Sequence, residues 1–161
     1  MTQTSERVVV LGVGNVLMSD EGAGVRCVEW LEAHAALPPG VIAIDGGTST
    51  NELLEALEGL DLLIIVDAVV SDGPPGSLVR LEGDRIPQAF SNKLSPHQHG
   101  INDLLAALQL IGRAPRRVVL FGVTPRRIEL GLELSAEVAA ALPVLAARVV
   151  AELGGAADGA A

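Results

Sequence analysis

The chain has 161 residues, the length of one ordinary domain, and 49% of them are hydrophobic while 19% are charged. This composition suits a folded domain with a full core and excludes a disordered chain. The 20 acidic residues outnumber the 11 basic ones, for a formal net charge of -9. Because no basic cluster exists beyond Arg116-Arg117 and Arg126-Arg127, nucleic acid and anionic membranes are poor partners.

The cysteine content and the chain ends suggest a cytoplasmic protein. Cys27 is the only cysteine, so an intramolecular disulfide is impossible and a reducing compartment is expected. The longest aliphatic run, residues 62–66, is far too short to cross a bilayer, so we expect no membrane insertion. We expect a single domain over residues 1–161, with frayed tails at residues 1–6 and 154–161.

Short apolar runs alternate with segments of helical periodicity. The first run, residues 7–11, is rich in valine and does not alternate with polar residues, which is typical of a strand buried on both faces. The predicted strands are residues 7–11, 41–44, 62–66, 77–81 and 117–123. The predicted helices are residues 22–37, 51–60, 101–111 and 135–153, the last kinked at Pro143; a loop over residues 82–99 precedes the third.

This alternation predicts an α/β fold, a three-layer α/β/α sandwich around a five-stranded, mostly parallel sheet. In such sheets, ligands bind outside the carboxyl ends of the strands, where the winding reverses direction. With the first strand in the centre, flanked by the second and third, the crevice is expected between the carboxyl ends of the first and third strands.

Two familiar motifs are incomplete. Gly12-Val13-Gly14 follows the first strand and Asp45 ends the second, as in a dinucleotide-binding fold, but Leu17 replaces the third glycine. Asp20 and Glu21 also bring negative charge to the place of a pyrophosphate. Dinucleotide binding is therefore the weaker alternative.

The candidate nucleophiles have simpler explanations. Residues 47–51 approach a G-x-S-x-G elbow, but Asn51 replaces the last glycine. Ser49 or Thr50 is more easily understood as a helix N-cap. Cys27 lies between apolar residues of the first predicted helix, where a buried thiol behaves as a small hydrophobe.

Acidic residues and one imidazole remain for the crevice. Glu21 follows the first strand, Asp67 interrupts or ends the third, and His97 precedes a helix. A buried carboxylate is costly unless it is paired or binds a metal, although a strand-end Asp that caps a loop explains Asp67 equally well. Two carboxylates and an imidazole would suit a divalent transition metal.

Four motifs, taken in order, resemble those of the nickel–iron hydrogenase maturation endopeptidases. These enzymes process the hydrogenase large subunit, and the likeness is closest to the subgroup that serves membrane-bound uptake hydrogenases. The motifs are Leu11-Gly12-Val13-Gly14-Asn15-Val16-Leu17 with Asp20-Glu21-Gly22, Asp45-Gly46-Gly47-Thr48, Asp67-Ala68, and Asn92-Lys93-Leu94-Ser95-Pro96-His97-Gln98. The resemblance runs from about residue 7 to at least residue 123.

The resemblance implies a hydrolase with a mixed, phosphorylase/hydrolase-like sheet in which one strand is antiparallel. It implies that Glu21, Asp67 and His97 form a metal-binding trio, in which Asp67 and Glu21 are also catalytic in an aspartyl-type protease. The metal would be nickel already held by the substrate. The partner would be the large-subunit precursor, from which a C-terminal extension is removed after nickel insertion. A non-catalytic nickel-sensing chaperone stays open as an alternative.

The remaining site residues are assigned more loosely. Asp45 and the turn Gly46-Gly47-Thr48 are expected to position the substrate tail, although such a turn is also suited to simple chain reversal. His99 stands where the family pattern suggests an apolar residue, so it competes with His97 as the imidazole ligand. Residues two apart point to opposite sides in a strand or a helix, and Pro96 constrains the chain just before His97. We therefore expect His97 to be the ligand and His99 to cap the helix or meet solvent.

Overall fold

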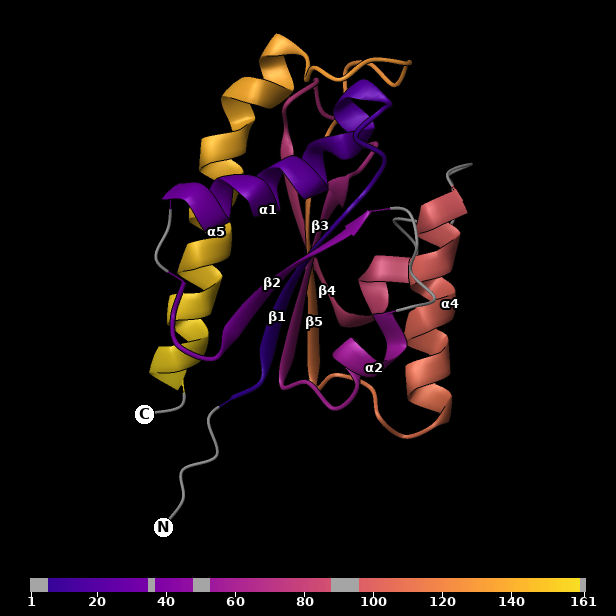
Figure 1. Cartoon of the computed structure of the whole chain (residues 1–161), viewed down its shortest axis with the longest axis vertical. Coiled ribbons are helices and arrows are strands. Elements are labelled where there is room, and N and C mark those ends of the chain that lie inside the picture. The colour runs from indigo at the N-terminus through magenta and orange to yellow at the C-terminus, as the bar shows by residue number, and fades with distance from the viewer. Residues whose placement is uncertain (1–5, 35–36, 48–52, 88–95, 160–161) are drawn as a thin grey trace.

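The computed structural model describes residues 6–34, 37–47, 53–87 and 96–159. Five strands form one sheet in the order β2-β1-β3-β5-β4 (Figure 1). The strands are β1 (Val8–Val13), β2 (Val41–Gly47), β3 (Leu62–Ala68), β4 (Leu78–Glu82) and β5 (Arg117–Val123). All neighbouring strands are parallel except β4, which runs antiparallel to β5. The predicted α/β class, the mixed sheet and the place of β1 between β2 and β3 are confirmed, but the central strand of the five is β3 rather than β1.

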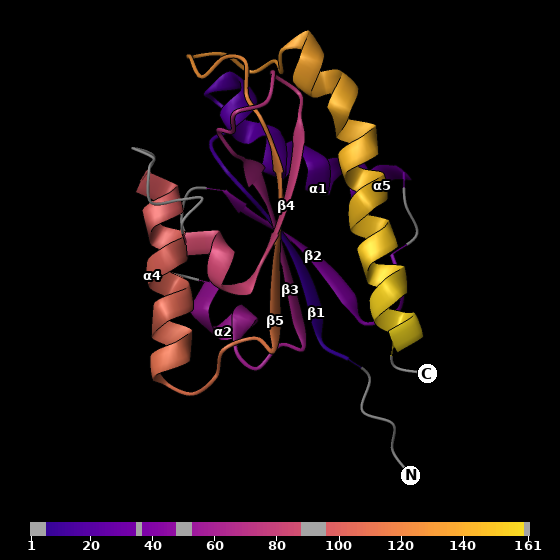
Figure 2. The ribbon, with the colours of Figure 1, turned by 180° about the vertical axis from the view of Figure 1, so that it is seen from behind.

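Helices cover both faces of the sheet. Figures 1 and 2 show α1 (Ala23–His34) and α5 (Ala136–Gly159) on one face, with α2 (Leu54–Leu57) and α4 (Pro96–Leu110) on the other. Two short 3-10 turns, η1 (Ser19–Gly22) and η3 (Gly83–Arg85), lie in the connections. None of the helices in the described residues has the length and apolar character needed to cross a membrane.

The core consists of two aliphatic layers, one on each side of the sheet. Successive side chains of a strand point to opposite faces, so Val8 and Val10 pack with α1 and α5, while Val9 and Leu11 pack with α2 and α4. Every residue of β1 and β3 is buried. This explains why both strands are continuous apolar runs without polar alternation.

Several boundaries differ from those predicted. The third strand continues through Asp67 to Ala68, whereas α2 is only four residues long. The prediction of a loop up to residue 99 is wrong at its end, because α4 begins at Pro96. Proline suits the first position of a helix, since its fixed φ fits and no helical N–H is lost there. The last helix continues on both sides of Pro143 and extends to Gly159.

One connection folds back over the carboxyl edge of the sheet. The segment between β5 and α5, residues 124–135, meets the segment after β1 in a short parallel bridge between Met18 and Gly131. The backbone N–H of Ser19 donates to Gly131 O at 2.9 Å, and Gly131 N–H donates to Leu17 O at 2.8 Å. We call this connection the 124–135 loop.

Candidate active site

Glu21 and Asp67 lie at the carboxyl edge, after β1 and at the end of β3 respectively. Asp67 is fully buried and lies opposite Gly122 of β5 in the sheet register. Its Oδ1 accepts a hydrogen bond from the backbone N–H of Ala68 at 2.8 Å. Glu21 belongs to η1 and is half-buried. Both residues thus lie at the edge where the crevice between the first and third strands was predicted.

Gly14 shows how closely these two residues approach. A Cβ placed on Gly14 would lie 1.9 Å from the carbonyl oxygen of Glu21 and 3.5 Å from Asp67 Oδ1. Its φ of 129° is also accessible mainly to glycine. Any side chain here would push η1 away from Asp67, so this glycine is required for the contact.

The same close packing surrounds Gly12, the other glycine that suggested a dinucleotide loop, because a Cβ on Gly12 would lie 2.4 Å from the carbonyl oxygen of Gly24. A Cβ on Gly24, in the first turn of α1, would lie 2.0 Å from Val66 O and 2.5 Å from Val13 O. The helix therefore starts directly against the ends of β1 and β3. The space beside Gly14 is filled by the chain's own turn η1, whereas a dinucleotide loop leaves that space for a pyrophosphate.

Asp20, the neighbour of Glu21, is fully buried but has a different environment. Its carboxylate accepts hydrogen bonds from the backbone N–H groups of Arg126 (2.9 Å), Arg127 (3.0 Å) and Ser135 (2.7 Å). The Ser135 hydroxyl donates a fourth at 2.8 Å. Burial by itself raises the pKa of Asp20, but the hydrogen bonds from Ser135, Arg127 and Arg126 outweigh it and hold the pKa below its ordinary value.

This arrangement makes Asp20 a tether between three segments. It joins η1 to the 124–135 loop and to the start of α5, where the hydroxyl of Ser135 accepts the N–H of Val138 at 3.4 Å. An anionic side chain is also favoured at a helix N-terminus. Four hydrogen bonds, three to Oδ2 and one to Oδ1, commit the Asp20 carboxylate to holding these segments together. Sequence reasoning missed this role, because the donors lie more than one hundred residues away.

The Asp45-Gly46-Gly47 segment ends β2 in a bulge next to Gly14. The β1–β2 register shifts between Gly12 and Val13, and Gly14 N–H donates to Gly47 O at 2.9 Å. The exposed Asp45 accepts the N–H of Gly47 through Oδ1 at 2.9 Å. The turn therefore borders the same edge as Asp67 and Glu21. Thr48, Ser49 and Thr50 lie outside the described residues.

His97 and His99 both belong to the first turn of α4. Their side chains lie outside the described part of the structure, so the choice between them stays a prediction. Among the described side chains, no group of three His, Cys, Asp or Glu residues is placed to hold a metal. Glu21 and Asp67, two of the three residues expected to bind the metal, both lie at this edge of the sheet.

Cys27 has the role expected of it. The thiol is fully buried in the apolar layer beneath α1, and this burial raises its pKa to about 12. A thiol of this kind carries no thiolate at neutral pH and is a poor nucleophile or metal ligand. It is part of the core.

The chain is thus an α/β protein with two acidic residues, Glu21 and Asp67, at the carboxyl ends of β1 and β3. A family model described as hydrogenase maturation protease matches residues 25–152. The hydrogenase 2 maturation protease of Escherichia coli (strain K12) is 43% identical over 148 residues, covering 91% of this chain and 90% of that protein. The HupD hydrogenase expression/formation protein of Rhodobacter capsulatus is 44% identical over 150 residues, covering 92% and 71%.

Solved structures agree with these sequence matches. The hydrogenase maturating endopeptidase HybD from E. coli superposes with a TM-score of 0.89 at 42% identity, covering 93% of each chain. HybD from Thermococcus kodakarensis, a [NiFe] hydrogenase maturation protease, gives 0.74 at 30% identity, covering 89% of this chain and 96% of that one. The chain belongs to the hydrogenase maturation protease family, and the resemblance inferred from its motifs is confirmed.

Proposed function

We propose that this endopeptidase removes a C-terminal extension from the large-subunit precursor of a nickel–iron hydrogenase, in the cytoplasm and after nickel insertion. Family membership supports the class of reaction. The observation that carries the proposal is the close packing of Gly14 against the backbone of Glu21 and near the buried Asp67, which places both acidic residues at one edge of the sheet. Asp67 is fully buried at the strand edge where α/β sheets bind their ligands.

Recognition of nickel is assigned to Glu21, Asp67 and His97. Carboxylate oxygens and an imidazole nitrogen suit a divalent transition metal, and the two described members of this set lie at one edge. Three protein ligands leave coordination positions for groups of the precursor. Nickel is then part of the substrate, and a precursor without nickel lacks the group that bridges it to the enzyme.

Peptide hydrolysis requires water to add to the scissile carbonyl carbon, the C–N bond to break, and a proton to reach the leaving amine. A divalent cation beside the bond polarises the carbonyl and acidifies the water. Asp67, oriented by the N–H of Ala68, is assigned as the group that accepts the proton of the water and passes it on. Glu21 is assigned to hold the reacting groups against Asp67.

The turn after β2 is assigned to the substrate tail. Asp45 is exposed and its carboxylate orients the N–H of Gly47, while Gly14 ties the turn to the edge. An extended tail crossing this edge would pass Asp45 and the Gly46-Gly47-Thr48 turn on its way to Asp67. The turn would fix which bond is presented for cleavage.

The test is incubation of the purified chain with nickel-loaded and with nickel-free precursor, followed by mass measurement of the precursor. We expect loss of a C-terminal fragment only from the nickel-loaded form, and protection by chelator only when it is added before nickel is inserted. Equal cleavage of both forms would disprove the nickel requirement. Binding of the loaded precursor without any cleavage would indicate a nickel-sensing chaperone instead.

A further inference from the structure

Exposed apolar side chains gather beside the proposed site. Among the described residues, nine large hydrophobic side chains are exposed, and four of them lie on the two segments joined by the Met18–Gly131 bridge. We call these four the apolar rim: Leu17 (54% exposed), Ile128 (50%), Leu130 (84%) and Leu132 (63%). Single exposed hydrophobics are ordinary on a protein surface, whereas a local group of them indicates an interaction site.

Hydrogen bonds, buried or partly buried, fix the backbone that carries the rim. Leu130 and Leu132 flank Gly131, whose N–H donates to Leu17 O, so the three leucines surround one bridge. The hydroxyl of Ser19 donates to Glu129 O at 2.8 Å on the same loop. Asp20 fixes both ends of the loop through Arg126, Arg127 and Ser135. A rigid apolar surface binds a partner with little loss of conformational entropy.

The rim is continuous with the edge that carries the carboxylates. Leu17 precedes η1, the turn that contains Glu21, and the 124–135 loop crosses above that turn at the carboxyl end of the sheet (Figures 1 and 2). A peptide bond that reaches Glu21 and Asp67 must bring the neighbouring surface of its protein to this position. The activity of the family therefore supplies an occupant, which is a protein substrate.

We propose that the apolar rim is the docking surface for an apolar patch of the precursor next to its cleavage site. The inference rests on the proposed function and adds the means by which the folded precursor is held. The arginines beside the rim are paired within the chain, Arg126 with Glu137 and Arg127 with Glu129, so the surface suits an apolar partner rather than an anionic one. The formal net charge of -9 opposes docking on an anionic membrane.

The experiment compares the wild-type chain with a Leu130→Ser/Leu132→Ser double variant in steady-state cleavage of nickel-loaded precursor. Leu110→Ser is the matched control, since Leu110 is 88% exposed and ends α4 at the opposite end of the sheet. We expect KM to rise about tenfold in the rim variant, with kcat within about twofold, because apolar contact area is lost without change to the reacting groups. The control should match the wild type.

Direct binding separates this inference from the proposed function. Precursor affinity, measured by calorimetry, should fall in the rim variant and be retained by the Leu110→Ser control, even where no cleavage occurs. Unchanged affinity and KM in the rim variant would overturn the docking surface, whether or not the chain cleaves. A wild-type dimer in sedimentation that the rim variant loses would assign the rim to a second copy. Wild-type binding to phosphatidylserine vesicles that the rim variant loses would assign it to a membrane.

Discussion

At the scale of single residues, the two fully buried aspartates Asp20 and Asp67 have different roles. The carboxylate of Asp20 accepts four hydrogen bonds, all from Arg126, Arg127 and Ser135 of the 124–135 loop. Asp67 instead lies at the edge of the sheet, with Gly14 and η1 packed beside it. Both are costly to bury, but only Asp67 occupies the position where a ligand of an α/β sheet binds. Asp20 is therefore a tether and Asp67 the proposed reactive group.

Replacement of Asp67 by Asn tests this difference. The amide keeps the shape of the side chain but binds a cation poorly and cannot accept a proton, so we expect processing to fall by more than about 100-fold. The circular dichroism spectrum should stay that of the wild type. Asp72→Asn, which changes an exposed carboxylate five residues further on, should process normally. Full activity of Asp67→Asn would move the carboxylate role to Glu21.

At the scale of elements, η1 and the 124–135 loop form one unit with the start of α5. Ser19 takes a positive φ of 54° within this unit, and both its N–H and its hydroxyl are bonded to the loop. Such a conformation is unfavourable for a residue with a side chain unless the surroundings enforce it. The position of Glu21 therefore depends on contacts made far along the chain.

Asp20→Ala should destabilise the fold by about 3 kcal/mol, because it leaves three N–H groups and one hydroxyl without their acceptor, and the N–H and hydroxyl of Ser135 are buried. Ser135→Ala removes one bond to Asp20 and the helix cap, and should cost about 1 kcal/mol. Urea unfolding of both variants measures the difference. Similar small costs for the two would show that the tether contributes little to stability.

The two histidines of α4 are distinguished by the geometry of its first turn. Because α4 already begins at Pro96, residues 97 and 99 are separated by about 200° around the helix axis, so only one of them faces any given site. We expect His97→Ala to abolish precursor processing and His99→Ala to retain most of it, with circular dichroism confirming that both variants fold. The reverse result would make His99 the ligand.

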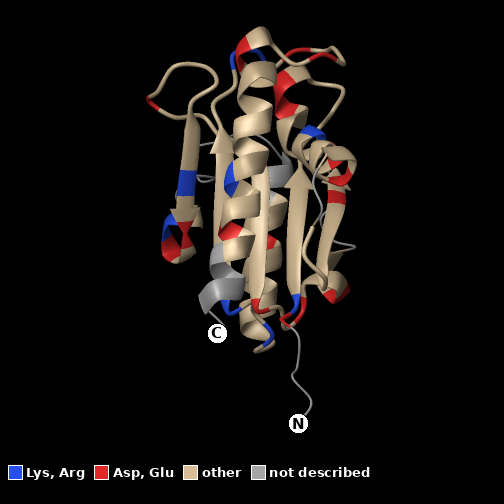
Figure 3. Ribbon diagram, turned by 90° about the vertical axis from the view of Figure 1, so that its left-hand side faces the viewer, with Lys and Arg blue, Asp and Glu red and all other residues tan. Residues whose placement is uncertain are grey.

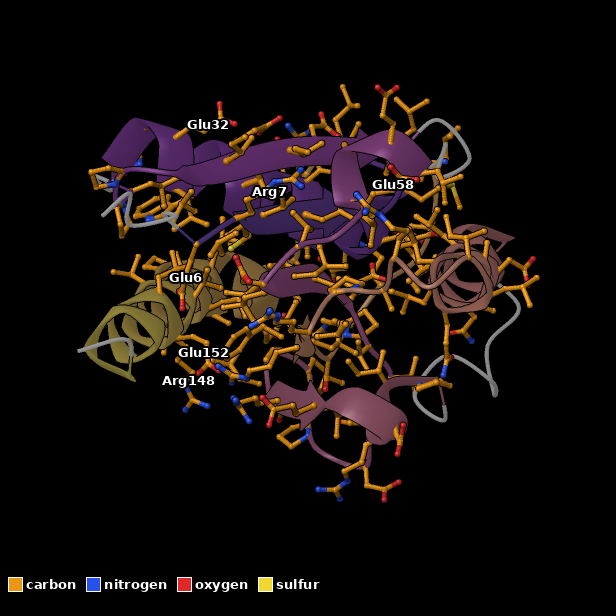
Figure 4. The ribbon with its side chains drawn as sticks, turned by 90° about the horizontal axis from the view of Figure 1, so that it is seen from below. Glu6, Arg7, Glu32, Glu58, Arg148 and Glu152 are labelled. Carbon is orange, nitrogen blue, oxygen red and sulfur yellow. The ribbon has the colours of Figure 1, made fainter. Side chains whose placement is uncertain are left out.

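At the scale of the whole molecule, hydrogen bonds and ion pairs join neighbouring elements away from the proposed site. At the amino end, Arg7 N–H donates to Asp61 Oδ2 at 2.7 Å and its guanidinium to Glu58 O at 3.2 Å, which places the labelled Arg7 and Glu58 together (Figure 4). Elsewhere, Glu152 accepts hydrogen bonds from Arg80 and Arg117. Lys and Arg form short, separate segments on the face shown in Figure 3. Ion pairs of this kind are structural, and exposed ones contribute little.

Alkylation of Cys27, the single cysteine, measures whether the domain is folded. Since burial raises the pKa of Cys27 to about 12, the thiol stays protonated and shielded at about pH 8, and iodoacetamide should not modify the native chain. In concentrated urea the same residue should react fully. Mass measurement of the labelled chain checks this, and rapid labelling without unfolding would show that α1 detaches from the sheet.

Much of the fold and part of the site could be predicted from local pattern. Unbroken aliphatic runs such as residues 62–66 mark strands covered on both faces, and parallel connections place their carboxyl ends at one edge. Asp67 and Glu21 could therefore be assigned to the same crevice from the sequence alone. Pro96 also carried a usable signal, since proline favours the first helical position.

Only the tertiary structure shows that Asp20, next to Glu21 in the sequence, is a structural tether. This role depends on donors at residues 126, 127 and 135, and no local pattern encodes a hydrogen bond across 115 residues. The apolar rim could not be predicted from local pattern either. It depends on the Met18–Gly131 bridge, which joins two connections that the sequence alone predicts as separate loops. The spacing of apolar residues indicates which side of a helix or strand faces the core. The meeting of two irregular segments is set by the packing of the whole chain.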